Sequence, residues 1–206
     1  FELCQSGKQR RKNELFRRAE DITTKPVRLY EAGNGTQNSN EPKTDTMIKK
    51  ELLLGDEAIA MGAHAGLSGV YAYPGTPSTE ITEFIQMPPP TRERGIHCNW
   101  SANEKAALEA ALGMSFVGKR ALVCMKHVGM NVCADAFVNS AMTGANGGLV
   151  VVAADDPSDA LSQNEQDSRF YAKFAMIPRF EPASQQEAYE MIGEAFDFSE
   201  KYQIPV

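Results

Sequence analysis

Apolar and polar positions along the chain alternate between two spacings, a pattern typical of an α/β protein. Short apolar runs, which suit buried strands, are separated by stretches with apolar residues three or four positions apart, which suit helices. The predicted strands are Gly69–Tyr73, Ile96–Trp100, Arg120–Met125 and Gly148–Ala154, and the helices between them are Gly55–Ala65, Pro77–Gln86, Asn103–Val117 and Gly129–Met142. The alternation predicts a three-layer αβα sandwich with a mostly parallel sheet.

The pattern is less regular beyond Ala154. It predicts a helix over Ser162–Phe174, a short strand over Arg179–Glu181 and an amphipathic helix over Ser184–Tyr202. The chain ends on the apolar segment Ile204–Val206, so we expect a further domain to follow.

The first 46 residues differ from the rest in composition. They hold nine of the 21 basic and seven of the 27 acidic residues, and Gly, Asn and Thr are common between Glu31 and Thr46. The basic run Lys8–Lys12 is compatible with a nucleic-acid patch, but poor apolar periodicity favours a solvated tail. Because Met47 is a natural start, we expect 1–46 to be an extension that is disordered or vector-derived, and 47–206 to be the domain.

Composition narrows the class of protein. The net charge of −6 over 206 residues argues against a nucleic-acid surface, and no apolar stretch is long enough to cross a bilayer. No signal-peptide pattern follows Phe1, so we expect a cytoplasmic protein. The four cysteines form no C-x-x-C pair, which favours buried reduced thiols over a zinc site or a disulfide framework.

The stretch Tyr71–Ile81 predicts an abrupt change from strand to helix. Pro74 and Gly75 favour a sharp turn, and Thr76 follows at the mouth of that turn. Pro77 suits a first helical position, with capping oxygens on the three residues that follow it. This arrangement predicts a polar crevice above the sheet, where open α/β sheets bind ligands.

Polar residues follow every predicted strand. The segments are Tyr73–Ser78, Ser101–Lys105, Lys126–Asn131 and Asp155–Ser158. Because parallel strands end at one edge of the sheet, these segments predict a ligand site there, although turns and caps use some of the same residues.

Glu104 is the most informative of these residues. It begins an Ala-rich helix, so its carboxylate can cap that helix and interact with the helix dipole. Alternatively the carboxylate meets a nitrogen atom of a ligand. From the residue alone both interpretations stay open, and capping is the more ordinary one.

Several motifs together resemble a known family. They are Tyr73–Ser78 (YPGTPS), Asn103–Lys105 (NEK), Met125–Gly129 (MKHVG), Ala154–Pro157 (ADDP) and Ser162–Arg169 (SQNEQDSR). In this order they resemble the thiamine-pyrophosphate-dependent 2-oxoacid:ferredoxin oxidoreductases, most of all the large subunits of the indolepyruvate-specific branch. The resemblance covers Met47–Val206.

The resemblance implies the pyrimidine-binding domain of a thiamine enzyme. It implies that Glu104 is catalytic and contacts N1′ of the aminopyrimidine, and that Thr76 and His127 lie on the substrate side; a structural role for His127 is an open alternative. The other cofactor-binding residues expected are Tyr73, Pro74, Gly75, Gly129 and Asn131. Lys126 and Arg169 are cations that can steer a carboxylate, although Arg169 is the better candidate for a surface or interdomain residue.

The resemblance also implies oxidative decarboxylation of an aryl pyruvate to an acyl-CoA, carbon dioxide and reduced ferredoxin, within anaerobic amino-acid catabolism. The Gly-Asp-Gly metal motif of thiamine enzymes and cysteine runs for clusters are missing from the sequence. No metal site is therefore predicted here, and Mg²⁺ and 4Fe–4S clusters are expected from other regions. The expected partners are a pyrophosphate-binding domain of the same full-length chain, a smaller beta subunit, ferredoxin, coenzyme A and further copies in an oligomer, so this segment alone should be inactive.

Two other functions compete with this one. A non-oxidative thiamine decarboxylase or transketolase shares the glutamate and the fold, but is not expected to carry both the Tyr73–Ser78 and Lys126–Gly129 motifs. A non-catalytic nucleotide-binding module would need a G-x-G-x-x-G after a strand or a P-loop, and the sequence has neither.

Overall fold

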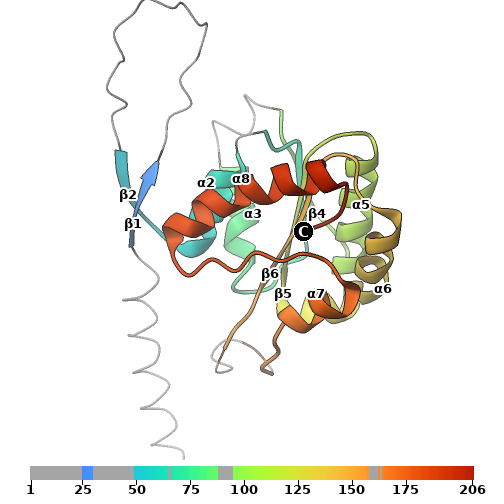
Figure 1. Cartoon of the computed structure of the whole chain (residues 1–206). Coiled ribbons are helices and arrows are strands. Elements are labelled where there is room, and N and C mark those ends of the chain that lie inside the picture. Colours follow the sequence, from blue (N-terminus) through green and yellow to red (C-terminus); the bar gives the residue numbers. More distant parts are fainter. Residues whose placement is uncertain (1–24, 30–48, 65, 88–94, 158–161, 163) are drawn as a thin grey trace, which may run out of the picture.

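The central feature of the fold is a parallel sheet with helices on both faces. The computed structural model describes residues 25–29, 49–64, 66–87, 95–157, 162 and 164–206 (Figure 1). The sheet has the order β4-β3-β5-β6, and its strands are β3 (Gly69–Ala72), β4 (His97–Trp100), β5 (Ala121–Lys126) and β6 (Leu149–Ala154). All three pairings are parallel, which confirms the predicted α/β sandwich.

Successive side chains of each strand enter different halves of the core. On one face Val70, Leu122 and Cys124 pack against α2 (Gly55–Ala63), α3 (Thr79–Gln86) and α8 (Gln185–Tyr202). On the other face Val123 and Met125 pack against α5 (Glu104–Phe116), α6 (His127–Thr143) and α7 (Arg169–Ala175). Figure 1 shows these two groups of helices on either side of the strands. Every residue of β5 is buried, because this strand is central and covered on both faces.

Two helices pack unusually closely on the first of these faces. A Cβ atom at Gly62 of α2 would lie 2.2 Å from the carbonyl oxygen of Tyr189 in α8. Glycine at position 62 therefore allows the backbones of α2 and α8 to approach each other.

Several predicted elements differ from the structure. Helix α6 begins at His127, not Gly129, because the backbone of Lys126 is extended (φ −72°, ψ 159°) and β5 passes directly into the helix. The helix predicted over Ser162–Phe174 is wrong in its first half, where the backbone N–H of Ser168 bonds the Asp155 carboxylate. The strand predicted over Arg179–Glu181 is absent from the described sheets, and its charged side chains form ion pairs instead.

A second, two-stranded sheet lies beside one end of α8 (Figure 1). Strand β1 (Lys25–Leu29) pairs antiparallel with β2 (Lys49–Leu53). Within 1–46, for which we expected disorder, residues 25–29 therefore form a strand. The other residues of that segment lie outside the described ones, so whether it is native to the protein stays untested.

The last described residue, Val206, pairs with β6 along the outer edge of that strand. The backbone N–H of Val206 donates to Leu149 O at 3.0 Å, and Val206 O accepts from the N–H of Val151 at 2.8 Å. This is the hydrogen-bond pattern of a parallel pairing.

Candidate site at the carboxyl edge of the sheet

Three of the predicted polar segments meet at one edge of the sheet. β3 lies between β4 and β5, and all three strands run in the same direction, so the segments that follow them emerge side by side. A Cβ atom at Gly75, after β3, would lie 3.2 Å from Cβ of Lys126 at the end of β5. The sequence therefore predicted this juxtaposition correctly.

The turn after β3 is fixed by its own hydrogen bonds. The Gly75 N–H donates to Oγ1 of Thr79 at 2.9 Å, and the Ser78 N–H and hydroxyl both donate to Gly75 O, at 2.9 and 2.8 Å. Helix α3 consequently begins at Thr79, and the prediction that Pro77 is the first helical residue is wrong. Tyr73, Pro74 and Thr76 are exposed at the mouth of the turn.

Glu104 and its neighbour Asn103 have different roles. Oδ1 of Asn103 accepts the N–H of Ala106 at 2.9 Å, so Asn103 is the helix cap. Glu104 is only 7 % exposed, and no hydrogen bond or ion pair joins its carboxylate to another residue in the described part of the chain. The capping interpretation of Glu104 is wrong for its side chain, and a buried carboxylate without a partner is a group that a ligand can satisfy.

Gly129 makes room for that carboxylate. A Cβ atom at this position would lie 2.6 Å from Cγ and 2.7 Å from Oε1 of Glu104. Glu104 on α5 therefore packs directly on the first turn of α6. Burial, with a smaller contribution from the charge of Glu104, raises the pKa of the nearby Cys133 thiol to about 12, so this cysteine is protonated and an unsuitable nucleophile.

His127 is completely buried at the beginning of α6. Its Nε2 lies 3.2 Å from the backbone oxygen and 3.3 Å from Oδ1 of Asn164, and its Nδ1 has no hydrogen-bond partner among the described atoms. Sequence reasoning gave Asn164 no role, although it lies in the Ser162–Arg169 motif, because the contact joins residues 37 positions apart.

The remaining predicted residues serve the local structure. Asn131 is exposed and accepts a hydrogen bond from the Tyr171 hydroxyl of α7, so its side chain faces that helix. Arg169 bonds Asp167 at 2.7 Å and Glu181 at 2.8 Å on the surface, in agreement with the surface interpretation. After β6, the carboxylate of Asp155 accepts the Ser168 hydroxyl at 2.5 Å.

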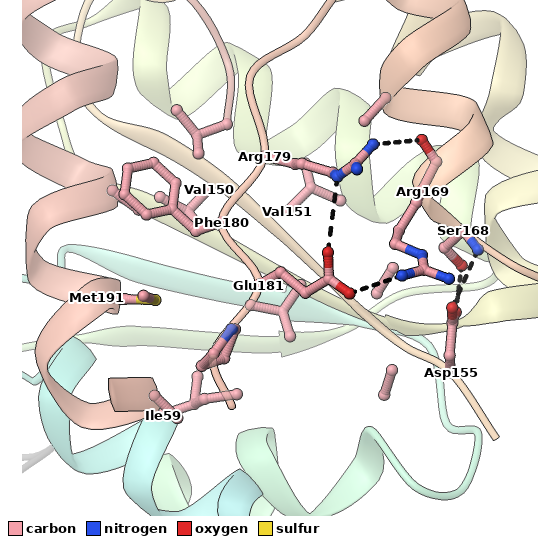
Figure 2. A pocket seen from close by; sticks show the side chains of 18 of the residues that line it. Ile59, Val150, Val151, Asp155, Ser168, Arg169, Arg179, Phe180, Glu181 and Met191 are labelled. Carbon is pink, nitrogen blue, oxygen red and sulfur yellow. Dashed lines mark hydrogen bonds and ion pairs between the residues drawn. The ribbon is translucent and has the colours of Figure 1, made fainter. Parts of the chain in front are cut away.

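A large cavity lies elsewhere, beside β6 (Figure 2). It has a volume of about 940 Å³ and an apolar wall that includes Ile59, Val151 and Phe180. Arg169, Glu181 and Arg179 also line it and form ion pairs with one another. Apart from Arg169, which was considered as a cation that can steer a carboxylate, none of the residues predicted for cofactor or substrate lines it. We therefore assign the candidate site to the strand ends around Glu104 and not to this cavity.

The described residues contain neither a metal-binding cluster nor a membrane-spanning helix. No group of three or more His, Cys, Asp or Glu residues in these ranges is placed to hold a metal ion. Within the same ranges, no helix has the length and apolar character needed to span a membrane.

The fold and site define a class: a parallel α/β domain that places a buried carboxylate at the carboxyl edge of its sheet, where such domains bind cofactors. The sequence profile described as "Pyruvate flavodoxin/ferredoxin oxidoreductase, thiamine diP-bdg" matches residues 61–206. The chain belongs to this family. Its name refers to thiamine diphosphate, which is the same compound as thiamine pyrophosphate.

The names of three relatives are consistent with this family. An indolepyruvate oxidoreductase subunit from Pyrococcus horikoshii is 54% identical over 155 residues, which cover 75% of this chain and 24% of the relative. The corresponding subunit from Archaeoglobus fulgidus is 48% identical over 170 residues, covering 81% and 27%. A 2-oxoglutarate synthase subunit from Methanothermobacter thermautotrophicus is 29% identical over 167 residues, covering 78% and 44%. The chain thus spans about a quarter of the length of these indolepyruvate relatives.

A solved structure has the same fold. It is the 2-oxoglutarate:ferredoxin oxidoreductase from Magnetococcus marinus with 2-oxoglutarate, coenzyme A and succinyl-CoA bound. The TM-score is 0.60 at 23% sequence identity, and the match covers 74% of this chain and 27% of that one.

Proposed function

We propose that residues 47–206 are the pyrimidine-binding domain of a 2-oxoacid:ferredoxin oxidoreductase that oxidatively decarboxylates an aryl pyruvate such as indolepyruvate. Family membership supports thiamine pyrophosphate as the cofactor. Relatives named for indolepyruvate are 48–54% identical in the two cases above, whereas the one named for 2-oxoglutarate is 29% identical, and this difference supports the substrate. No observation favours a non-oxidative thiamine enzyme or a nucleotide-binding module.

The observation that carries the proposal is the buried Glu104 carboxylate packed on Gly129 without a partner. These residues fit an aminopyrimidine, whose ring nitrogen offers the proton-sharing partner that the carboxylate lacks. Glu104 would hold a proton between its carboxylate and N1′ in a site with little water. When bound, thiamine pyrophosphate supplies the carbon that adds to the 2-oxo group and holds the electrons left when carbon dioxide departs.

The neighbouring segments would complete the site. Gly75 and the exposed Tyr73 and Pro74 lie at the same edge as Glu104 and would border the cofactor, with Gly129 below the carboxylate. Exposed Thr76 is free to hydrogen-bond the substrate carboxylate or keto oxygen, and His127 would lie on the substrate side. Asn131 has the weakest support among the proposed cofactor residues, because Tyr171 already holds its side chain.

The rest of the reaction would need other parts of the protein. We assign Mg²⁺, the pyrophosphate group and the 4Fe–4S clusters to regions outside this chain, and ferredoxin, coenzyme A, a smaller beta subunit and an oligomeric cytoplasmic assembly to the whole enzyme. Helix α7 supports a partner surface, because Phe170 and Phe174 are 66% and 75% exposed and Met176, just after the helix, is 88% exposed. Apolar side chains gathered in this way commonly mark a protein interface.

Replacing Glu104 with glutamine tests the assignment. In the full-length complex we expect Glu104→Gln to lower indolepyruvate-dependent viologen reduction by about 100-fold or more, because the amide cannot exchange a proton with N1′. The unfolding midpoint should stay close to that of the wild type. Glu109→Gln, an exposed change on the same helix, is the matched control and should retain activity. Wild-type turnover in Glu104→Gln would refute the proposal.

A further inference from the structure

The ring of His127 is oriented by Asn164. The ring is 0% exposed, and its Nε2 lies 3.2 Å from the Asn164 backbone oxygen. A carbonyl oxygen only accepts hydrogen bonds, so this contact requires a proton on Nε2. The Asn164 side chain can contribute at 3.3 Å, but the backbone contact alone is sufficient to determine which nitrogen carries the proton.

The other ring nitrogen then has a defined chemical character. In a neutral imidazole with a proton on Nε2, Nδ1 carries a lone pair and accepts a hydrogen bond. Nδ1 of His127 is buried and has no partner among the described atoms. Buried polar atoms are rarely left without a partner, so an orphan acceptor at a ligand-binding edge indicates a donor on the ligand.

The position of His127 connects this acceptor with the candidate site. His127 is the first residue of α6, and Gly129, two residues later, contacts the Glu104 carboxylate. Lys126, one residue earlier, contacts the turn that carries Gly75. His127 therefore lies between two residues whose contacts join neighbouring strand ends, Lys126 and Gly129.

We propose that Nδ1 of His127 accepts a hydrogen bond from an N–H group of the bound ligand, and that Asn164 is a positioning residue that holds the ring with its Nε2–H on the Asn164 carbonyl and Nδ1 as the acceptor. This inference rests on the proposed function, because that function supplies ligands with N–H groups. Two are available: the ring N–H of an indole-bearing 2-oxoacid, and the amino group on the pyrimidine of thiamine pyrophosphate. In either case the interaction would be lost with a ligand that lacks the N–H.

Two substitutions separate this role from a structural one. The amide group of Asn is placed near the position of Nδ1, whereas the longer side chain of Gln reaches the position of Nε2. His127→Asn therefore keeps an acceptor at the Nδ1 position and gives up the contact with Asn164. His127→Gln keeps a polar contact with Asn164 and gives up the acceptor. If His127 only anchors Asn164, the His127→Gln variant should keep the wild-type function. If His127 is a hydrogen-bond acceptor for the ligand, the His127→Asn variant should keep it.

The experiment measures kcat/KM for indolepyruvate and for phenylpyruvate, which has no ring N–H, together with binding of thiamine pyrophosphate and Mg²⁺ by protein fluorescence. The full-length complex is used. If the substrate is the donor, His127→Gln lowers the indolepyruvate-to-phenylpyruvate ratio by about tenfold or more while cofactor affinity is kept. If the cofactor is the donor, His127→Gln weakens cofactor binding by a similar factor and lowers kcat/KM for both substrates equally. In both cases His127→Asn stays within about threefold of the wild type.

A control and a contrary result complete the test. His97, the exposed first residue of β4, lies at the amino end of the sheet, so His97→Gln should change neither quantity. The inference is overturned if His127→Gln matches the wild type in substrate ratio and cofactor affinity, or if Gln rescues and Asn does not. Failure of the wild type to turn over any 2-oxoacid or to bind the cofactor would instead contradict the proposed function.

Discussion

At the scale of single residues, the neighbouring side chains of Asn103 and Glu104 make different interactions. Asn103 has an extended backbone (φ −164°, ψ 175°) and caps α5, which leaves Glu104 in the first turn with its carboxylate free. Both side chains can cap a helix, so the sequence did not predict this division between them. The division depends on the residue at which the helix begins, and a sequence pattern rarely fixes a helix end that closely.

Gly129→Ala should disturb the site with little effect on the fold. The new methyl group would lie 2.6 Å from Cγ of Glu104, so the carboxylate has to move. We expect the affinity of the full-length complex for thiamine pyrophosphate to fall by about tenfold or more, measured by protein fluorescence.

The matched control for that change is Gly113→Ala. Gly113 lies in α5 with open space around its Cα, so alanine should leave affinity unchanged and raise the free energy of unfolding by about 0.5–1 kcal/mol. Wild-type affinity in Gly129→Ala would show that the Glu104 position is irrelevant to the cofactor.

At the scale of elements, the sequence predicted every strand of the parallel sheet and the helices between them. The apolar runs succeed because buried parallel strands are apolar on both faces, as in β5. The predictions were wrong in segments where contacts of individual side chains, and not apolar periodicity, determine the backbone conformation. The Asp155–Ser168 bonds hold the segment before α7 out of a helix, and ion pairs of Arg179 and Glu181 replace the strand that was expected.

The contact between α2 and α8 should be sensitive to a single methyl group. Gly62→Ala would place Cβ 2.2 Å from Tyr189 O, a backbone atom that cannot rotate away. We expect the free energy of unfolding to fall by about 1–3 kcal/mol, because the helices must separate. Urea denaturation of the full chain measures this change.

Gly193→Ala provides the comparison within α8. A Cβ atom there has nothing within 4 Å, so this variant should be as stable as the wild type or more stable by up to about 1 kcal/mol. Equal stability of Gly62→Ala and the wild type would mean that the two helices are not held at this distance.

At the scale of the whole molecule, individual long-range side-chain contacts are the part that the sequence did not reveal. The contact between His127 and Asn164 joins the segments after β5 and β6, and no pattern along the chain indicates it, whereas the approach of Gly75 to Lys126 follows from the predicted parallel sheet. The gathering of the loops at the carboxyl edge was predictable, because parallel strands bring successive loops to one edge, whatever the loop sequences are. Packing across the sheet determines which side chains at this edge lack a hydrogen-bond partner.

Stability of the whole molecule should depend on the protonation of Asp56. Burial, with smaller contributions from the charges of Glu80 and Glu57, raises the pKa of this carboxyl from 3.8 to about 7. The folded state therefore holds a proton that the unfolded chain releases at lower pH, so the contribution to stability is complete below about pH 4 and is lost as pH rises to about 7.

Asp56→Asn should remove this dependence. We expect a flatter profile of unfolding free energy against pH and, at about pH 8, a gain of up to about 4 kcal/mol over the wild type. Urea titrations of the full chain between about pH 5 and pH 8 measure both effects. Glu83→Gln, an exposed change on α3, should leave the profile unaltered. An unchanged slope in Asp56→Asn would assign the pH dependence to other groups.

The contact between Glu104 and Gly129 crosses over the end of β3, a strand that precedes neither residue directly. Glu104 follows β4 and Gly129 follows β5, and these strands are separated by β3. A shift of one residue in the pairing of either strand with β3 would move one side of this contact by about 3.3 Å along the sheet. Cofactor affinity would thus report on strand alignment, and a chain with misaligned strands would lose its ligand even if its helix content were normal.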